Sequence, residues 1–279
     1  MKKTLLALLM IFGLMLSSCD AGMASTSFRI QHPDDSSKQI EYFVEKPPGK
    51  GPWPTVVLLH GHQEIRRPGG EDFVKWGVLK ELSSRGYLAV AVSQPGYGNS
   101  SGPADFCGPF TQHAVAAVIA KLRAEGLVSP QKLLIEGISR GAITAGLVAA
   151  QDPSISGLIL ISGVYDLSAY VNDPHASSVK QSVVKALMAE TGGTADALNA
   201  RSVISYASEI KAATLILNGA KDELTDPEQA QSLSDRITRA GGKARAIIYP
   251  EFGHQIPVEE RNKDIDPFMD GVLGNARHS

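Results

Sequence analysis

A serine flanked by two glycines lies where an apolar run meets a helical pattern. The residues Gly137-Ile138-Ser139-Arg140-Gly141 follow Leu133-Leu134-Ile135 and precede a small-residue stretch at 142–150. A glycine at each end of the turn avoids the collision that a larger side chain would have with nearby backbone. The turn then raises the serine hydroxyl above a sheet, and the N-terminus of the following helix points at the same place. This pattern predicts a nucleophile at Ser139.

A serine hydroxyl is a weak nucleophile near neutral pH, so it needs a base and a third group that orients the base. Two later apolar runs end in suitable residues. The run at 214–217 leads to Asp222, and the run at 244–249 leads to His254. The chain order serine, acid, histidine is that of one class of catalytic triads. The sequence therefore predicts acyl transfer, in which Ser139 attacks a carbonyl, His254 takes the proton and Asp222 orients the imidazole.

Alternating strands and helices are predicted to position these three residues. Apolar or alternating runs predict strands at 39–45, 55–59, 88–92, 132–136, 158–161, 214–217 and 244–249, and helical patterns cover 73–85, 111–125, 142–150, 227–240 and 258–273. This alternation predicts an α/β fold with a mostly parallel sheet covered on both faces. The segment 164–213 interrupts the rhythm and contains a helical stretch near 179–190. It is either a small cap over the strand ends or a surface excursion with no role in the pocket.

Four stretches resemble the α/β-hydrolase superfamily, and within it the dienelactone-hydrolase and prolyl-oligopeptidase-like branch. They are VVLLHGH, QPGYGNSSGP, IIYPEFGH and ARSVISYASEIKAATLILNGAKDELTDPEQA, which leads to the acid. The resemblance covers most of the chain from Gln39 onward. It implies a doubly wound, mostly parallel eight-stranded sheet with a small cap insertion, over residues 28–279. The chain departs from the branch at Thr225-Asp226, where Val-Pro is frequent, and at Asn218, where His is common. Asp226 is therefore a rival for the acid role.

The resemblance also implies an oxyanion hole made of backbone N–H groups. Arg140, the residue after the nucleophile, supplies one donor. In relatives the residue after His-Gly donates the other, which indicates His62 here and Gln63 as the second choice. The alternation of His60, His62 and Glu64 would suit a metal ion on a strand, but His-Gly-x is a usual loop of this fold and no fourth ligand is evident. We expect neither metal nor cofactor. Arg66 and Arg67 are either solvated loop residues or partners for a substrate carboxylate.

Residues 1–18 are predicted to be a bacterial lipoprotein signal peptide. A basic head, Lys2-Lys3, precedes an apolar run at 4–16 that is too short to anchor stably across a bilayer. The sequence Leu16-Ser17-Ser18-Cys19 resembles a lipobox, whose cysteine is acylated; an ordinary signal peptide cut nearby is the alternative. Residues 19–27 then form a tether. We expect a lipid anchor on Cys19 in the bacterial cell envelope, on the periplasmic side of the inner membrane if Asp20 acts as a retention signal.

Charge and domain organisation limit the function. With 27 basic and 29 acidic residues, the net charge of −2 gives no reason to expect a nucleic-acid partner. The expected partner is a small-molecule ester or a short peptide. We favour an ester because no propeller precedes the domain, unlike the large oligopeptidases of the branch. The alternatives are a peptidase acting on short peptides and, from another class, a non-catalytic envelope binding protein, which loss of a triad residue would have supported.

Overall fold

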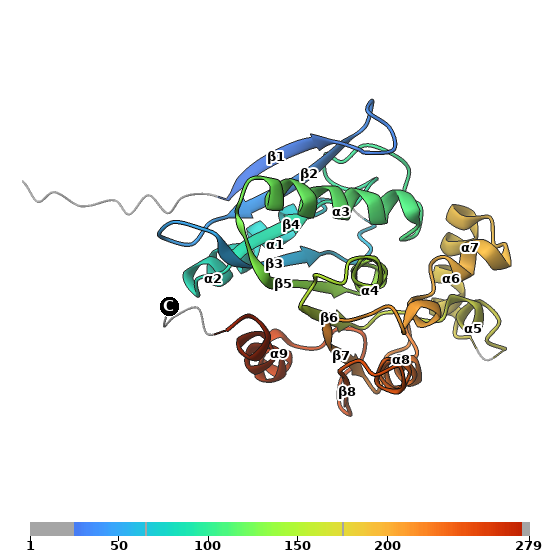
Figure 1. Cartoon of the computed structure of the whole chain (residues 1–279). Helices are drawn as coiled ribbons and strands as arrows, with labels where there is room; N and C mark the ends of the chain where they lie inside the picture. Colours follow the sequence, from blue (N-terminus) through green and yellow to red (C-terminus); the bar gives the residue numbers. More distant parts are fainter. Residues whose placement is uncertain (1–24, 65, 175, 275–279) are drawn as a thin grey trace, which may run out of the picture.

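An eight-stranded sheet forms the centre of the molecule (Figure 1). The computed structural model describes residues 25–64, 66–174 and 176–274. The strands are β1 (Thr26–Gln31), β2 (Gln39–Glu45), β3 (Trp53–Leu59), β4 (Leu88–Val92), β5 (Val128–Ile138), β6 (Gly157–Ile161), β7 (Ala213–Gly219) and β8 (Ala244–Tyr249). Their order is β1-β2-β4-β3-β5-β6-β7-β8; the pairs β1–β2 and β2–β4 are antiparallel and the other five are parallel. The predicted mostly parallel eight-stranded α/β sheet is confirmed.

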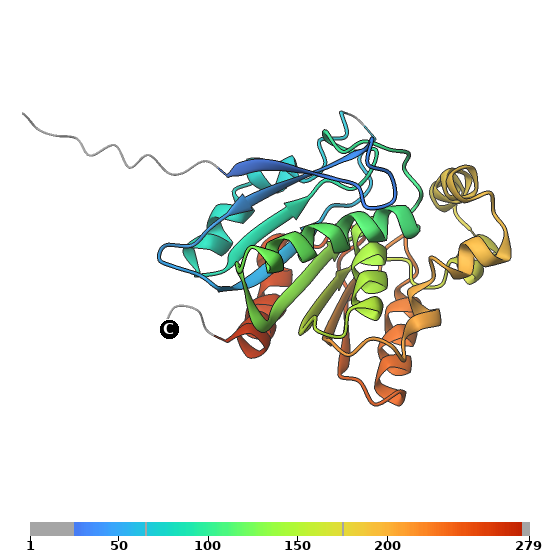
Figure 2. The same cartoon turned by 45° about the horizontal axis from the view of Figure 1, so that its top comes forward.

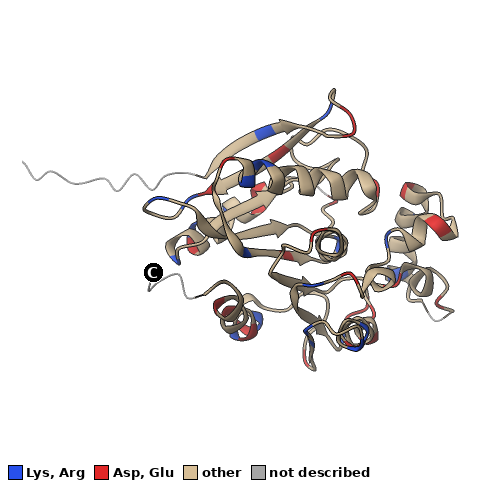
Figure 3. Cartoon of the chain, in the orientation of Figure 1, with Lys and Arg blue, Asp and Glu red and all other residues tan. Residues whose placement is uncertain are grey.

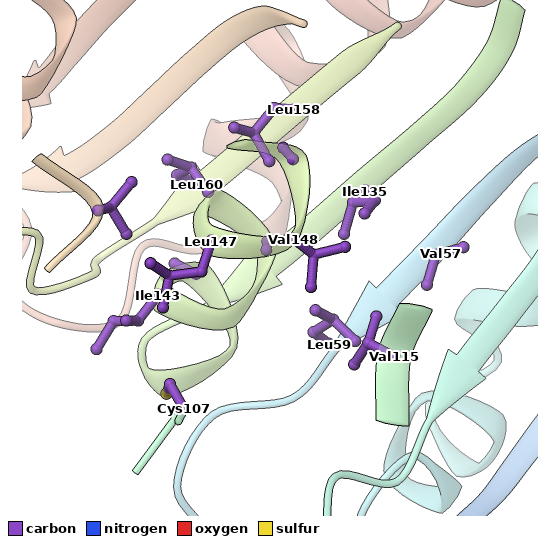
Figure 4. Packing of buried hydrophobic residues seen from close by; sticks show 14 of the residues in the cluster. Val57, Leu59, Cys107, Val115, Ile135, Ile143, Leu147, Val148, Leu158 and Leu160 are labelled. Carbon is purple, nitrogen blue, oxygen red and sulfur yellow. The ribbon is translucent and has the colours of Figure 1, made fainter. Parts of the chain in front are cut away.

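Helices cover both faces of the sheet, as Figure 2 shows from a second direction. The helices are α1 (Glu71–Lys75), α2 (Val78–Ser84), α3 (Pro109–Ala124), α4 (Arg140–Gln151), α5 (Leu167–Val171), α6 (Ser178–Thr191), α7 (Ala195–Asn199), α8 (Pro227–Arg239) and α9 (Val258–Leu273). One apolar core lies between the sheet and α3, α4 and α8, and a second lies between the sheet and α1, α2 and α9. Figure 4 shows Ile143 and Leu147 of α4 and Leu160 of β6 among the buried residues of the first core.

The register of the parallel strands brings the ends that carry the predicted site to one edge. Leu59 of β3 pairs with Gly137 of β5, and Ile138 pairs with Ile161 of β6. Ile161 in turn pairs with Leu217 of β7. In an open parallel sheet, the loops that leave the carboxyl ends of the strands form the ligand site. The residues after β3, β5, β7 and β8 therefore face a common region.

The turn from β5 into α4 depends on close approaches between backbone segments. Ser139 adopts φ 54° and ψ −117°, in the left-handed half of conformational space that L-residues rarely enter. A Cβ at Gly137 would lie 2.2 Å from the Gly141 carbonyl oxygen, and a Cβ at Gly141 would lie 2.2 Å from that of Leu59. Both glycines are required because any side chain would force α4 away from β3 and β5.

Two predicted boundaries are wrong. β1 begins at Thr26, inside the range 19–27 assigned to the tether. Its side chains are mostly exposed and its pairing with β2 holds it in place, so it lacks the apolar signal of a buried strand. The helix predicted at 73–85 is two helices, because Gly77 adopts φ 75° between α1 and α2. A left-handed glycine is a common helix terminator.

The segment 164–213 forms α5, α6, α7 and a short 3-10 helix at Val203–Tyr206. Figures 1 and 2 both place α5, α6 and α7 to one side of the sheet, beyond the strand ends. Ser177 caps α6 by accepting a hydrogen bond from the Lys180 N–H, and Gly192 ends the helix in a left-handed conformation. This segment therefore adds a helical layer over the edge that carries the site.

Acidic and basic residues are interspersed along the chain (Figure 3), and both signs occur together on α8 and α9. None of the helices in the described part of the chain is long and apolar enough to cross a membrane. The predicted signal peptide at 1–18 and the lipidation of Cys19 lie outside the described residues and stay predictions.

Two glycine-to-alanine substitutions should change stability in opposite directions. We expect Gly141→Ala to lower the free energy of unfolding by ~1–3 kcal/mol because its Cβ overlaps the Leu59 carbonyl. A Cβ on Gly271, inside α9, would have no other atom within 4 Å, so Gly271→Ala should raise that free energy by ~0.5–1 kcal/mol. Thermal denaturation followed by circular dichroism measures both, and a stabilised Gly141→Ala protein would contradict the packing argument.

Candidate active site

Ser139, His254 and Asp222 form one continuous line of hydrogen bonds. The Ser139 Oγ lies 3.0 Å from His254 Nε2, and His254 Nδ1 lies 2.9 Å from Asp222 Oδ2. Because a carboxylate can only accept, the Nδ1–H donates to Asp222 and the Nε2 lone pair is left to accept the serine proton. The three side chains come from the loops after β5, β7 and β8. The structure thus brings together all three residues that the sequence predicted to act as nucleophile, base and acid.

Asp222 is held by donors on both carboxylate oxygens, and its side chain is fully buried. Oδ1 accepts the N–H groups of Leu224 and Thr225 at 2.8 and 2.9 Å, while Oδ2 accepts the Thr225 hydroxyl and, at 3.3 Å, the Asn218 amide. Burial raises the pKa of Asp222, but hydrogen bonds from His254 and Thr225 outweigh it and hold the pKa below its usual value. The carboxylate therefore stays ionised beside the imidazole.

The rival acid, Asp226, has a different task. It is the N-cap of α8, where its Oδ1 accepts the Glu228 N–H at 3.0 Å. Thr225 and Asn218, by contrast, contact Asp222 directly, although sequence reasoning gave neither a role. The sequence singles out both only as departures from the branch. The structure accordingly separates Asp226, a helix cap, from Asp222, the partner of His254.

Both predicted oxyanion donors border the space beside Ser139. Arg140 is the first residue of α4, so its N–H has no carbonyl partner within the helix. A Cβ on Gly61 would lie 3.2 Å from the Ser139 Cβ, which places the loop after β3 directly against the nucleophile. His62 follows in that loop and lines the same cavity. Gln63, the second choice, instead uses its side chain to hold Gly69 and Asp72.

A cavity of about 510 Å³ lies above Ser139. Its apolar wall comes from α6, α4 and nearby loops, and its polar groups come from α6 and from the residues after β3, β5, β7 and β8. The lining residues are His62, Glu64, Phe106, Ser139, Arg140, Ile143, Val164, Val179, Ser182, Val183, Ala186, Leu224, Thr225, His254 and Gln255. Such a volume suits a small ligand that is buried on most sides. Because Val179, Val183 and Ala186 belong to α6, the 164–213 segment forms one wall of the site.

The Arg140 side chain ties α6 to the nucleophile turn. The side chain is 7% exposed, and its guanidinium forms a two-pronged ion pair with Glu190 of α6. Glu190 also accepts the Phe106 N–H at 2.8 Å. Burial raises the pKa of Glu190, but the Arg140 charge and hydrogen bonds outweigh it and hold the pKa below its usual value. Sequence reasoning used only the backbone of Arg140, and Glu190 carried no motif that could have revealed the pair.

The remaining predicted side chains have local partners. His60 is buried; its Nδ1 donates to the Gly61 carbonyl at 2.8 Å and its Nε2 accepts the Gln94 N–H at 3.1 Å. Burial lowers the pKa of His60 to about 4, so it is neutral at neutral pH. Within the described ranges, no group of three His, Cys, Asp or Glu side chains is arranged to hold a metal ion. Arg67 lies over the Tyr97 ring and Arg66 lines another cavity, away from Ser139.

Comparisons with known proteins show the family of the chain. The model of the prolyl oligopeptidase family matches residues 108–275, and that of X-Pro dipeptidyl-peptidase (S15 family) matches residues 38–176. Dipeptidyl aminopeptidase BIII of Pseudoxanthomonas mexicana is 26% identical over 81% of this chain and 33% of its own length. A putative carboxymethylenebutenolidase of Escherichia coli (strain K12) is 22% identical over 82% of this chain and 77% of its own. The chain spans about a third of the length of the first of these relatives.

Solved structures share the fold. An acylaminoacyl peptidase of Pyrococcus horikoshii superposes with a TM-score of 0.73 at 18% identity, over 90% of this chain and 42% of that one. An esterase of Pyrococcus furiosus superposes with a TM-score of 0.67 at 17% identity, over 90% of this chain and 93% of that one. Since the first family model covers more than half of the chain, and the chain carries the serine, acid and histidine of a hydrolase in contact, it belongs to the prolyl oligopeptidase family of serine hydrolases.

Proposed function

We propose that this chain hydrolyses carboxylic esters through an acyl-enzyme on Ser139. The observation that carries the proposal is the hydrogen-bonded line from Ser139 through His254 to Asp222. The serine oxygen forms a bond to the ester carbonyl carbon while its proton passes to His254 Nε2. The intermediate expels the alkoxide, which takes that proton and leaves as the alcohol. Water, deprotonated by His254, then attacks the acyl carbon, and the serine departs with the proton.

The negative charge that develops on the carbonyl oxygen needs donors already in place. In this proposal the backbone N–H groups of Arg140 and His62 hold the oxyanion, with the N-terminus of α4 pointing toward it. Each such donor contributes about 3–4 kcal/mol to the transition state in a comparable hydrolase. Asp222, ionised and buried, stabilises the imidazolium that forms on His254.

The cavity and the relatives support an ester substrate of modest size. The α6 residues Val179, Val183 and Ala186 offer an apolar wall to an acyl chain. The esterase of Pyrococcus furiosus matches over 93% of its length, whereas the acylaminoacyl peptidase carries more than half of its chain outside the match. This match over nearly the whole length of an esterase supports an ester substrate.

A second candidate is a peptidase acting on short peptides. It is favoured by the family itself and by the similarity to dipeptidyl aminopeptidase BIII. The same serine, histidine and acid would cleave an amide by the same steps. The difference lies in the leaving group, because an amine must receive its proton from His254 before it can depart.

Substitution of the nucleophile tests the central claim. We expect a fluorophosphonate probe to label the wild-type chain and to leave Ser139→Ala unlabelled, because the probe bonds to an activated serine oxygen. Ser162→Ala is the matched control: this buried hydroxyl at the end of β6 has no hydrogen-bond partner in the described structure and should not affect labelling. Equal labelling of wild type and Ser139→Ala, read by mass spectrometry, would refute the proposed nucleophile.

The two candidate acids are distinguished by their asparagine variants. Asp222→Asn should lower kcat by about 10⁴-fold, because an amide favours the wrong imidazole tautomer while preserving the geometry. Asp226→Asn should leave kcat within a factor of two, since asparagine also caps a helix. Steady-state kinetics on p-nitrophenyl butyrate measures both, and the reverse ranking would give the acid role to Asp226.

Ester and amide substrates distinguish the two candidate functions. For p-nitrophenyl butyrate we expect kcat/KM at or above ~10⁴ M⁻¹s⁻¹, within the ordinary enzyme range. Aminoacyl and dipeptidyl p-nitroanilides should fall at least about 100-fold below the lower end of that range. An anilide that reaches the range would instead establish the peptidase, since nonspecific cleavage of an amide does not approach such values.

A further inference from the structure

The imidazole of His62 is fixed at the side of the Ser139 cavity by a buried tyrosine. His62 Nδ1 lies 2.8 Å from the Tyr97 hydroxyl, and the Tyr97 side chain is 1% exposed. The hydroxyl also lies 3.4 Å from an N–H of Arg140, whose guanidinium is held in turn by Glu190. A chain of contacts therefore runs from α6, through Arg140 and Tyr97, to His62.

The direction of the hydrogen bonds in this chain follows from the donors. A guanidinium can only donate, so the Tyr97 oxygen accepts from Arg140. Burial raises the pKa of Tyr97, so its hydroxyl keeps its hydrogen at neutral pH. That hydrogen has one acceptor within reach in the described structure, His62 Nδ1. A buried hydroxyl hydrogen without an acceptor would cost the free energy of its desolvation. The arrangement in which Tyr97 donates to His62 is therefore favoured.

The tautomer of His62 follows from that donation. Burial and the charges of Arg140 and Arg67 lower the pKa of His62, which favours the neutral imidazole at neutral pH. A neutral imidazole carries one hydrogen, and since Nδ1 accepts, the hydrogen is on Nε2. No hydrogen bond joins Nε2 to another described residue, and His62 is exposed where it borders the cavity. His62, which lines the cavity, thus carries a fixed N–H donor on the side of its ring away from Tyr97.

The sheet order places this donor on the side of Ser139 opposite the base. β3, which precedes His62, adjoins β5 on one side, whereas β8, which precedes His254, lies beyond β6 and β7 on the other. The leaving group must face His254, because that histidine returns the proton to it. The part of the substrate on the His62 side is therefore the carbonyl oxygen and the acyl group, not the leaving group.

We propose that His62 Nε2–H donates a hydrogen bond to an acceptor oxygen within the acyl group, so that the site favours esters of oxygen-substituted acids, such as alkoxy or acyloxy acids, over plain fatty acids. Tyr97 is a positioning residue that sets the tautomer of His62. Glu190 acts indirectly, because it holds the Arg140 side chain that contacts Tyr97. The inference rests on the proposed esterase function and names the substrate class of the same site. It uses the side chain of His62, which is distinct from the backbone N–H assigned to the oxyanion.

Two nearly isosteric substrates test the donor. p-Nitrophenyl methoxyacetate differs from p-nitrophenyl butyrate by an ether oxygen in place of one methylene. In each variant, kcat/KM for the methoxyacetate is divided by kcat/KM for the butyrate. Comparing this ratio with that of the wild type removes the difference in intrinsic reactivity of the two esters. We expect His62→Leu to lower the ratio about three- to tenfold, the worth of one neutral hydrogen bond. His62→Gln, which keeps an N–H near the Nε2 position, should restore much of it.

Tyrosine variants test whether Tyr97 sets the tautomer of His62. Tyr97→Phe should lower the same ratio about two- to fivefold, since Nδ1 then loses the donor that fixes its tautomer. Tyr87→Phe is the matched control: it is equally buried, but its hydroxyl bonds to Asp270 at 3.0 Å, in the other core, and its ratio should equal that of the wild type. Correlation of ¹⁵N and ¹H signals at neutral pH should show the His62 hydrogen on Nε2 in the wild type and a mixture in Tyr97→Phe.

Two results would overturn the proposal. One is an unchanged ratio in His62→Leu, including the case in which both esters slow equally because the side chain acts only on the attacked carbonyl. The other is a wild-type His62 hydrogen on Nδ1. Failure of the proposed function looks different, since the wild type would then neither turn over either ester nor be labelled by a fluorophosphonate. In that case the inference about the acyl group would be wrong as well, because it rests on the proposed esterase function.

Discussion

The close approach of backbone segments around Ser139 is the constraint on which the rest of the site depends. At Gly137 and Gly141 there is no space for a Cβ, so α4 can begin directly against the ends of β3 and β5. That contact forces Ser139 to φ 54° and aims its hydroxyl at His254. It also places Ser139 against the loop of Gly61 and His62. The turn therefore positions the nucleophile and the predicted oxyanion donors together, and any widening would disturb both.

The sequence predicts the residues whose signals are local. Ser139, Asp222 and His254 each follow an apolar strand in the expected order, and the structure joins them at 3.0 and 2.9 Å. β1 was missed because its exposed residues carry no apolar period and only its pairing with β2 makes it a strand. The division between α1 and α2 was missed because Gly77 lies within an otherwise helical pattern, where its left-handed conformation leaves no trace.

The supporting residues carry no recognisable motif, and two of the contacts join residues that only the tertiary fold brings together. Glu190 lies 50 positions after Arg140, and Tyr97 lies 35 after His62. Asn218 and Thr225 were noticed only as departures from a family pattern, yet both donate to Asp222. Each of these side chains contacts a buried polar or charged group. An ionised carboxylate, a guanidinium or a hydroxyl away from water requires hydrogen-bond partners. Which polar groups require such partners can be identified only once the fold has determined which of them are buried.

Arg140 joins two properties of the site in a single residue. Its backbone belongs to the turn that holds the nucleophile, and its side chain fastens α6, which forms a wall of the cavity. Moving α6 outward would remove the counter-ion of a side chain that is only 7% exposed. An unpaired buried charge costs far more than lost contact between apolar surfaces. The width of the cavity is consequently held by this ion pair. Because salt screens buried charges weakly, that width is insensitive to the ionic strength of the surroundings.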